Sequence, residues 1–136
     1  MEPRSSEANH NVLVVDDNES VREVLTIMLS RRGYRCESAT NGIEAVEKVR
    51  QSDFDAVVTD LQMPEMDGIG LTRELHQHFS DLPVMIMTGQ SDDSLVESAM
   101  SAGARGLLSK PFEISELLMR LQKMLHIHKP AGEQEA

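Results

Sequence analysis

The sequence has no tryptophan, and aromatic residues make up only 3 % of its 136 positions. Aromatic platforms that stack on bases or sugars are therefore not expected. The single cysteine, Cys36, has no second cysteine with which to form an internal disulfide. No apolar run approaches the roughly 20 residues that a membrane helix needs, and the first residues, MEPRSSEANHN, lack the apolar segment of a signal peptide. We therefore expect no membrane association and a cytoplasmic location.

Positive charge is also scarce, because 13 lysine and arginine residues stand against 23 aspartate and glutamate residues, giving a formal net charge of −10 at pH 7. A phosphate backbone would be repelled, so direct nucleic-acid binding by this domain is not expected. Apolar residues make up 40 % and charged residues 26 %, as is typical of globular chains. A chain of this length suits one domain around one core.

Apolar residues follow two alternating periods along the chain. Short runs rich in β-branched residues alternate with longer stretches in which apolar positions recur every three or four residues. This alternation predicts an α/β fold of five strand–helix units, with a parallel sheet covered by helices on both faces. The predicted strands are NVLVV, YRCESA, DAVVTD, LPVMIMTG and ARGLLS. The domain is assigned to residues 11–128, between a polar N-terminal tail (1–10) and a polar C-terminal tail or linker start (129–136).

Capping residues and glycines predict where the helices begin and end. We expect Ser20, with Glu23 reaching back, to open the first helix and Gly33 to end it. The second helix is expected to begin at Asn41 with Glu44, the third at Asp67, and the fourth at Ser91 or Asp92. Gly103 is expected to end the fourth helix, and the last helix is expected to run from Glu113 to His126.

Helical spacing also predicts which apolar side chains face the core. The inner face of the first helix is expected to hold Val21, Val24, Leu25, Met28 and Leu29, and that of the fourth Leu95, Val96, Ala99 and Met100. Methionines in apolar periods are interpreted as core filling rather than as a metal or peptide surface. These methionines are Met28, Met85, Met87, Met100 and Met124.

Polar residues follow the predicted strands at their carboxyl ends. Asp16 and Asp17 follow the first strand, Asp60 ends the third, Thr88 the fourth, and Lys110 follows the fifth. In an open parallel sheet the loops at these ends converge, and ligands bind there. Clustered carboxylates repel one another, and a divalent cation relieves that repulsion; an all-oxygen set suits Mg²⁺ better than zinc. The sequence predicts a magnesium site beside a carboxylate nucleophile.

Four motifs in this order resemble the receiver domain of two-component response regulators, of the single-domain chemotaxis-regulator type. They are VLVVDDN, DAVVTDLQMPEMDG, PVMIMTG and SKPF, and the resemblance covers residues 11–127. It implies a flavodoxin-like (βα)5 fold with strand order 2-1-3-4-5. It also implies a phosphorylation-activated switch that catalyses only its own phosphorylation and dephosphorylation, and that changes partner binding through the face of the fourth helix, fifth strand and fifth helix.

The resemblance assigns roles to particular residues. It implies that Asp60 accepts a phosphoryl group from a histidine kinase. It implies that Asp17, Asp60 and the backbone carbonyl of Gln62 hold Mg²⁺, or alternatively Mn²⁺, with Asp16 helping through water.

Further implied roles concern the phosphoryl group and the partners. Lys110 would pair with a phosphoryl oxygen, Thr88 would move onto the phosphoryl group, and the Lys110–Pro111 bond would be cis. The implied partners are a sensor histidine kinase or a histidine phosphotransfer protein, and a downstream protein or a covalent output domain. The resemblance is compatible with a monomer or a weak dimer.

The sequence departs from the family at one switch position. Leu107 stands where many receivers carry a tyrosine or phenylalanine three positions before the lysine. We expect Leu107 to act as packing, without the aromatic rotamer change. Gln62 and Gln90 stand two residues past Asp60 and Thr88, at positions that flank the path of the hydrolytic water. Two neutral amides leave the lifetime of the phosphoryl group open.

Alternative interpretations remain for these residues. Asp60 and Lys110 could form a structural ion pair, and the acidic pair after the first strand could be turn and cap residues. An aspartyl phosphatase of the haloacid dehalogenase type would need an acid at Gln62 and a cap domain. Flavodoxin-like cofactor binding would need a phosphate cradle after the first strand. The HQH and HIH triplets are interpreted as surface, because residues two apart on a helix do not face the same way.

Overall fold

The computed structural model describes residues 10–89 and 92–128. Its five parallel strands lie in the order β2-β1-β3-β4-β5, which confirms the predicted flavodoxin-like topology. The strands are β1 (Asn11–Val15), β2 (Arg35–Ala39), β3 (Ala56–Asp60), β4 (Val84–Thr88) and β5 (Gly106–Ser109). The helices are α1 (Glu19–Ser30), α2 (Gly42–Gln51), α3 (Gly68–His78), α4 (Asp93–Ala102) and α5 (Ile114–His128). The predicted tails, apart from His10, and also Gln90 and Ser91 lie outside the described residues.

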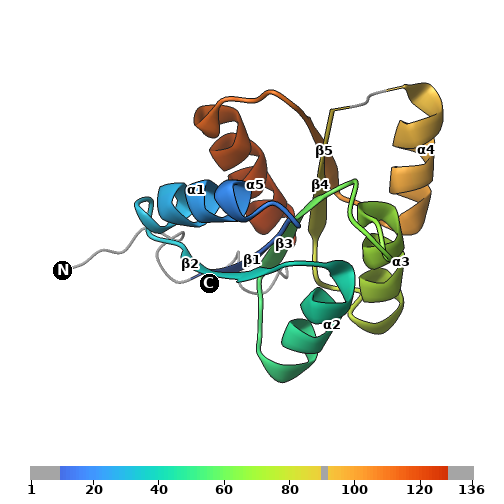
Figure 1. Cartoon of the computed structure of the whole chain (residues 1–136), viewed down its shortest axis with the longest axis horizontal. Helices are drawn as coiled ribbons and strands as arrows, with labels where there is room; N and C mark the ends of the chain where they lie inside the picture. Colours follow the sequence, from blue (N-terminus) through green and yellow to red (C-terminus); the bar gives the residue numbers. More distant parts are fainter. Residues whose placement is uncertain (1–9, 90–91, 129–136) are drawn as a thin grey trace.

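Helices cover both faces of the sheet: α1 and α5 lie on one face, and α2, α3 and α4 on the other (Figure 1). Strands β3 and β4 are buried along their whole length. Alternate side chains of β1 therefore enter different cores. Val12 and Val14 pack with residues of α1 and α5, whereas Leu13 and Val15 pack with residues of α2 and α3. Burial on both faces explains the uninterrupted apolar runs in the sequence.

The capping predictions are confirmed at three helices and wrong at one. Asn41, Asp67 and Asp92 each accept a hydrogen bond from a backbone N–H in the first turn of α2, α3 and α4. Helix α1 begins earlier than predicted, because the side chain of Asn18 accepts from Val21 N at 3.1 Å. Asn18 thereby fills the capping role, and Ser20 lies inside the first turn.

The predicted helix ends are close to the observed ones. Gly103 is the C-cap of α4 with a φ of 112°, a conformation that a glycine adopts without strain. Helix α1 ends at Ser30, and Gly33, with a φ of 96°, lies in the turn that follows.

Two predicted apolar faces are only partly correct. In α1 the core receives Leu25 and Leu29, while Val24 and Met28 are 54 % and 37 % exposed. Val24 and Met28 are exposed because a single helix resting on a sheet buries only a narrow stripe of side chains, here those spaced four residues apart. In α4 the packed stripe consists of the half-buried Leu95 with the buried Ala99 and Ala102, while Val96 and Met100 are 37 % and 50 % exposed. Among the methionines, Met85, Met87 and Met124 are buried as expected, whereas Met28 and Met100 are exposed.

Within the described ranges, no helix is both long and apolar enough to cross a bilayer.

Candidate functional site

The carboxyl ends of four strands bring the predicted site residues to one edge of the sheet. Asp16 follows β1, Asp60 ends β3, Thr88 ends β4, and Lys110 lies one residue beyond β5. Neighbouring strands are in parallel register there, with Asp60 opposite Met87 and Thr88 opposite Ser109. Residues that are far apart in the sequence therefore meet because a parallel sheet aligns its strand ends.

Three carboxylates form the acidic part of this edge. Asp16, Asp17 and Asp60 each offer an oxygen, and these atoms lie within 4.8 Å of one another. Asp16 is 2 % and Asp60 8 % exposed, whereas Asp17 is exposed to solvent. Like charges held this close in a partly desolvated place repel one another. A stable fold gains nothing from such an arrangement without a compensating cation.

Asp16 is the most buried of the three acids. Its Oδ1 accepts a hydrogen bond from Asn18 N at 2.9 Å, while its buried Oδ2 has no hydrogen-bond partner among the described residues. Burial raises the pKa of Asp16 above its usual range, and the nearby charges of Asp60 and Asp17 raise it further. The Asn18 N–H and the Lys110 ammonium oppose this rise. The geometry leaves a carboxylate oxygen that lacks a partner.

The cationic part of the edge is Lys110. Its Nζ lies 2.6 Å from Asp60 Oδ1, which joins residues 50 positions apart in sequence. The Lys110 backbone N–H also donates to Thr88 O at 2.7 Å. The peptide bond between Lys110 and Pro111 is cis, as the family resemblance implied. The ion pair considered as an alternative is thus present, and it forms beside the acidic cluster.

The donor set at this edge fits a hard divalent cation. All candidate side-chain ligands are carboxylate oxygens, which magnesium prefers over nitrogen or sulfur donors. The unpartnered Oδ2 of Asp16 is the kind of atom that a cation or its water would satisfy. One exposed acid, Asp17, leaves an approach from solvent. The residues present therefore fit Mg²⁺.

The loop after β3 is held close to the site. Gly68 N donates to Leu61 O at 2.7 Å, and a Cβ added at Gly68 would lie 2.5 Å from Asp60 O. Only a glycine allows α3 to begin this near to the end of β3. Gln62 lies exposed in the loop. A cap, Asp67, followed by a glycine is the sequence signal of this turn.

One residue at the edge was missed by sequence reasoning. Arg22 Nη1 donates to the backbone oxygen of Asp16 at 2.7 Å, so the first turn of α1 fixes the segment that carries the acidic pair. The sequence gives no sign of this contact, because an arginine in the first turn of a helix is a common surface residue.

The remaining predicted positions differ in how far the structure describes them. Leu107 is half-buried and packs against the small core that contains Ala99 of α4 and Ile86 of β4. Gln90 lies outside the described residues. His76 and His78 are exposed on α3, with His78 Nε2 3.5 Å from Glu74 Oε2, in agreement with the surface interpretation.

Comparisons with known proteins agree with this geometry. Residues 12–122 match the family model described as the response regulator receiver domain. The response regulator MprA of Mycobacterium avium is 38 % identical over 125 residues, which cover 92 % of this chain and 55 % of that protein. MprA of Mycobacterium leprae is 40 % identical over 119 residues, covering 88 % and 52 %. The chain therefore spans about half the length of these curated relatives.

Solved structures show the same likeness. The chemotaxis protein CheY4 of Vibrio cholerae has a TM-score of 0.83 and 31 % identity, with 86 % of this chain and 99 % of that chain covered. The response regulator TrrA of Thermotoga maritima, solved in complex with Mg²⁺ and BeF, has a TM-score of 0.78 and 30 % identity, covering 85 % and 98 %. With the family model, the relatives and the fold in agreement, this chain belongs to the receiver domains of two-component response regulators.

Proposed function

We propose that this domain is a phosphorylation-activated switch whose phosphoacceptor is Asp60. The observation that carries the proposal is the 2.6 Å contact between Lys110 Nζ and Asp60 Oδ1, placed beside two further carboxylates at the carboxyl edge of a receiver fold. The contact marks Asp60 as the acid whose oxygen can be balanced by a cation. Asp17 is proposed to share the metal with Asp60, and Asp16 to bind the metal's water.

The metal would be held by Asp17, Asp60 and the backbone carbonyl of Gln62, with Asp16 acting through water. When bound, Mg²⁺ neutralises the carboxylates and offsets negative charge on the transferred phosphoryl group. The Mg²⁺–BeF complex of the TrrA structure supports this assignment by analogy. Mn²⁺ has the same preference for oxygen donors and is the proposed substitute.

The transfer step needs a nucleophile and a charge-neutralising donor. A carboxylate oxygen of Asp60 attacks the phosphorus of a phosphohistidine, so that the new O–P bond forms as the N–P bond breaks and the histidine leaves. Lys110 then moves from the carboxylate to a phosphoryl oxygen, where its ammonium group offsets the added charge. Hydrolysis of the acyl phosphate returns Asp60 to its starting state, and the residues two positions past Asp60 and Thr88, Gln62 and Gln90, are proposed to tune its rate.

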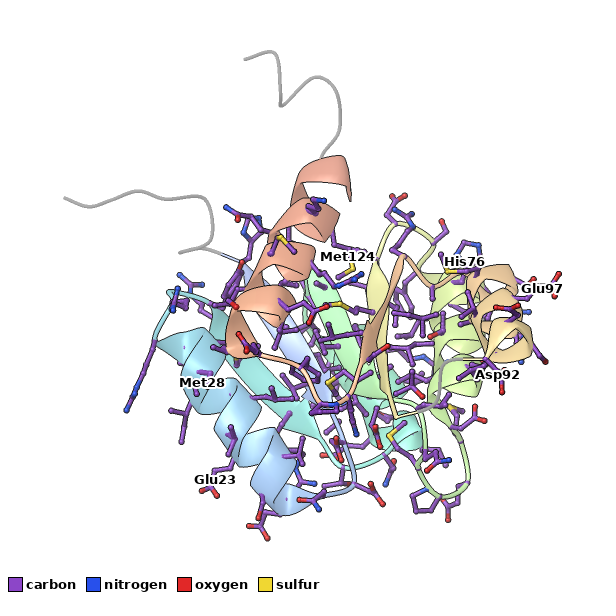
Figure 2. All side chains as sticks on the ribbon, turned by 90° about the horizontal axis from the view of Figure 1, so that it is seen from above. Glu23, Met28, His76, Asp92, Glu97 and Met124 are labelled. Atoms are coloured by element: carbon purple, nitrogen blue, oxygen red, sulfur yellow. The ribbon has the colours of Figure 1, made fainter. Side chains whose placement is uncertain are left out.

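The switch step couples this chemistry to the surface. Thr88 lies at the end of β4, beside β5 and before α4, so a movement of its hydroxyl toward the phosphoryl group pulls the segment that leads into α4. The proposed output surface is the face of α4, β5 and α5 (Figure 2). The proposed partners are a sensor histidine kinase or a phosphotransfer protein, and a downstream protein or linked output domain.

Intact-mass spectrometry tests the acceptor. With Mg²⁺ and acetyl phosphate, the wild-type chain should gain one phosphoryl group that is stable in acid and labile in base, as an acyl phosphate is. Asp60→Asn should gain none. Asp81→Asn, which changes an exposed acid in the loop before β4, is the matched control and should label like the wild type. Equal labelling of Asp60→Asn and the wild type would disprove the assignment of the acceptor.

A further inference from the structure

The seven residues between Asp60 and Gly68, which form the loop that carries Gln62, make a close contact with a helix outside the site. A Cβ built on Gly42, the first residue of α2, would lie 2.7 Å from Met66 Sδ, 2.9 Å from its Cγ and 3.0 Å from its Cβ. Real Cβ atoms do not approach other atoms this closely. Because the near carbons of Met66 are involved as well as its sulfur, rotation of the chain tip alone would not relieve the clash.

The same loop contains an unusual backbone conformation. Glu65 has a φ of 71°, and Met66 N donates to Pro64 O at 2.7 Å across it. A residue other than glycine at a positive φ of this kind costs free energy and persists where the surroundings hold it. Met66 follows Glu65 directly, and its half-buried side chain packs against the core on the α2 and α3 side of the sheet. The contact with Gly42 therefore acts next to the strained residue.

Both ends of this loop are already fixed. Thr59 Oγ1 lies 3.9 Å from Met63 Sδ, and the backbone N–H of Gly68 donates a hydrogen bond to Leu61 O. Between these points, the loop includes Gln62, whose carbonyl is a proposed metal ligand. Its tip is fixed from outside by the contact of Met66 with α2.

We propose that Met66, seated on Gly42, is a positioning residue for phosphoryl transfer: it holds the loop at residues 61–67 in the shape that presents the Gln62 carbonyl beside Asp60. The inference rests on the proposed function for its chemical consequence, but the contact itself belongs to the chain without any ligand. Helix α2 is thereby part of the support of the site, although none of its residues is among the proposed ligands. A glycine at position 42 is required because any side chain there would displace Met66.

Two substitutions, one on each side of the contact, separate the position of the loop from the stability of α2. Alanine favours a helix over glycine by about 1 kcal/mol, which offsets part of the strain that an added Cβ would cause at the buried Gly42. Gly42→Ala would therefore leave α2 formed while pushing Met66 and its loop away. In Met66→Ala the same loop loses its seat but no clash arises. Gly106→Ala in β5 is the control, because its added Cβ would meet Met85 Cγ at an ordinary 3.8 Å.

The first measurement is amide hydrogen exchange of the metal-free full chain, read on peptides that span residues 61–68. Gly42→Ala and Met66→Ala should each speed exchange there by about tenfold, while exchange in β1 and β4 stays at the wild-type rate. The double variant should resemble Met66→Ala alone, because alanine removes the Sδ and Cγ of residue 66 and leaves only its Cβ at 3.0 Å, which a shift of a few tenths of an ångström relieves. A merely structural role would speed exchange throughout the sheet and lower the Tm.

The second measurement is the Mg²⁺ concentration that gives half-maximal labelling by acetyl phosphate. It should rise about tenfold in Gly42→Ala and stay at the wild-type value in Gly106→Ala, with the Tm of both near the wild type. Wild-type exchange at 61–68 in both Gly42→Ala and Met66→Ala would overturn the inference, and so would additive effects in the double variant. Should Gly42→Ala fail to fold, Met66→Ala still decides. If acetyl phosphate failed to phosphorylate the wild-type chain, the proposed function would be contradicted. The exchange measurement would still show whether the contact of Met66 with Gly42 holds the loop.

Discussion

The two helices on either side of β5 are held to the molecule in different ways. Helix α5 buries four large side chains, which are Leu117, Leu121, Met124 and Leu125. Helix α4 fully buries only Ala99 and Ala102, half-buries Leu95, and leaves Val96 37 % and Met100 50 % exposed. In Figure 2, Met124 of α5 lies toward the middle of the molecule, whereas Asp92 and Glu97 lie at its α4 end.

This difference separates a fixed helix from a movable one. Each fully buried leucine or methionine contributes roughly 1.5–3 kcal/mol of burial, and an alanine contributes far less. Displacing α5 would open the core, whereas displacing α4 would cost little. An element that has to change position when a distant site changes is expected to be weakly packed. The structure has this property on the α4 side of β5.

The largest expected effect comes from truncating one side chain in each helix. Leu121→Ala should lower the free energy of unfolding by about 2–5 kcal/mol, because it leaves a cavity in the main core. Met100→Ala, at a half-exposed position, should change it by no more than about 0.5 kcal/mol. Urea unfolding of the full chain measures both values. Equal losses in the two variants would remove the distinction between the helices.

The next effect concerns movement on activation. With Mg²⁺ and beryllofluoride, amide exchange in α4 should change by about 5- to 150-fold, the range that a coupling free energy of 1–3 kcal/mol gives, while exchange in α5 stays nearly constant. Thr88→Ala should largely abolish the change in α4. Leu107→Ala should keep it, because Leu107 serves as packing in the small core under α4. A response lost in Leu107→Ala and kept in Thr88→Ala would reverse these two roles.

A smaller effect should come from the metal alone. If Mg²⁺ binds with millimolar affinity, a tenfold excess adds about 1.4 kcal/mol to the free energy of unfolding by mass action. A thermal melt at about ten millimolar Mg²⁺, ten times that dissociation constant, should therefore show a raised Tm in the wild type and a much smaller rise in Asp17→Asn. An unchanged Tm in the wild type would contradict the metal assignment. The effect should not distinguish α4 from α5, because the carboxylates belong to neither helix.

The smallest effect is a pH dependence at Asp16. Burial raises the pKa of this carboxyl in the folded chain above its ordinary value of 3.8, so the folded state holds the proton more tightly than the unfolded state. Stability contributed by the neutral acid is complete below pH 3.8 and is lost as the pH rises through the folded pKa. Without metal, Asp16→Asn should be more stable than the wild type at pH 7, by on the order of 1 kcal/mol. Urea midpoints between pH 4 and 8 should show this advantage shrinking toward acid, and a constant difference would refute it.

The contrast between α4 and α5 also shows what a sequence does and does not predict. Strand alternation, the strand-end acids and the caps at Asn41 and Asp67 depend on local chemistry, and each was predicted from its residues. The burial of Val96 and Met100 depends on how α4 is rotated against the sheet, and helical spacing leaves that rotation undetermined. Of the predicted inner face of α4, Leu95 and Ala99 pack against the core together with Ala102, whereas Val96 and Met100 do not.

The site shows the same division. The convergence of Asp16, Asp60, Thr88 and Lys110 follows from parallel topology alone. The unpartnered Oδ2 of Asp16, the Arg22 contact and the seat of Met66 on Gly42 depend on side-chain positions within an ångström. Nothing in residue spacing gives such distances, so these features were found only in the structure.

The ion pair between Asp60 and Lys110 has a consequence for the order in which the molecule is made. The three acids precede Lys110 in the chain, and the ammonium group lies 50 residues beyond Asp60. At a synthesis rate of roughly 5–20 residues per second, a nascent chain carries the acidic edge for several seconds before its cation is translated. During that interval, the emerging β1 and β3 can pair only against the repulsion of their own ends. Divalent cations around the ribosome would then assist the first pairing of strands, and Lys110 would take over that role when β5 joins the sheet.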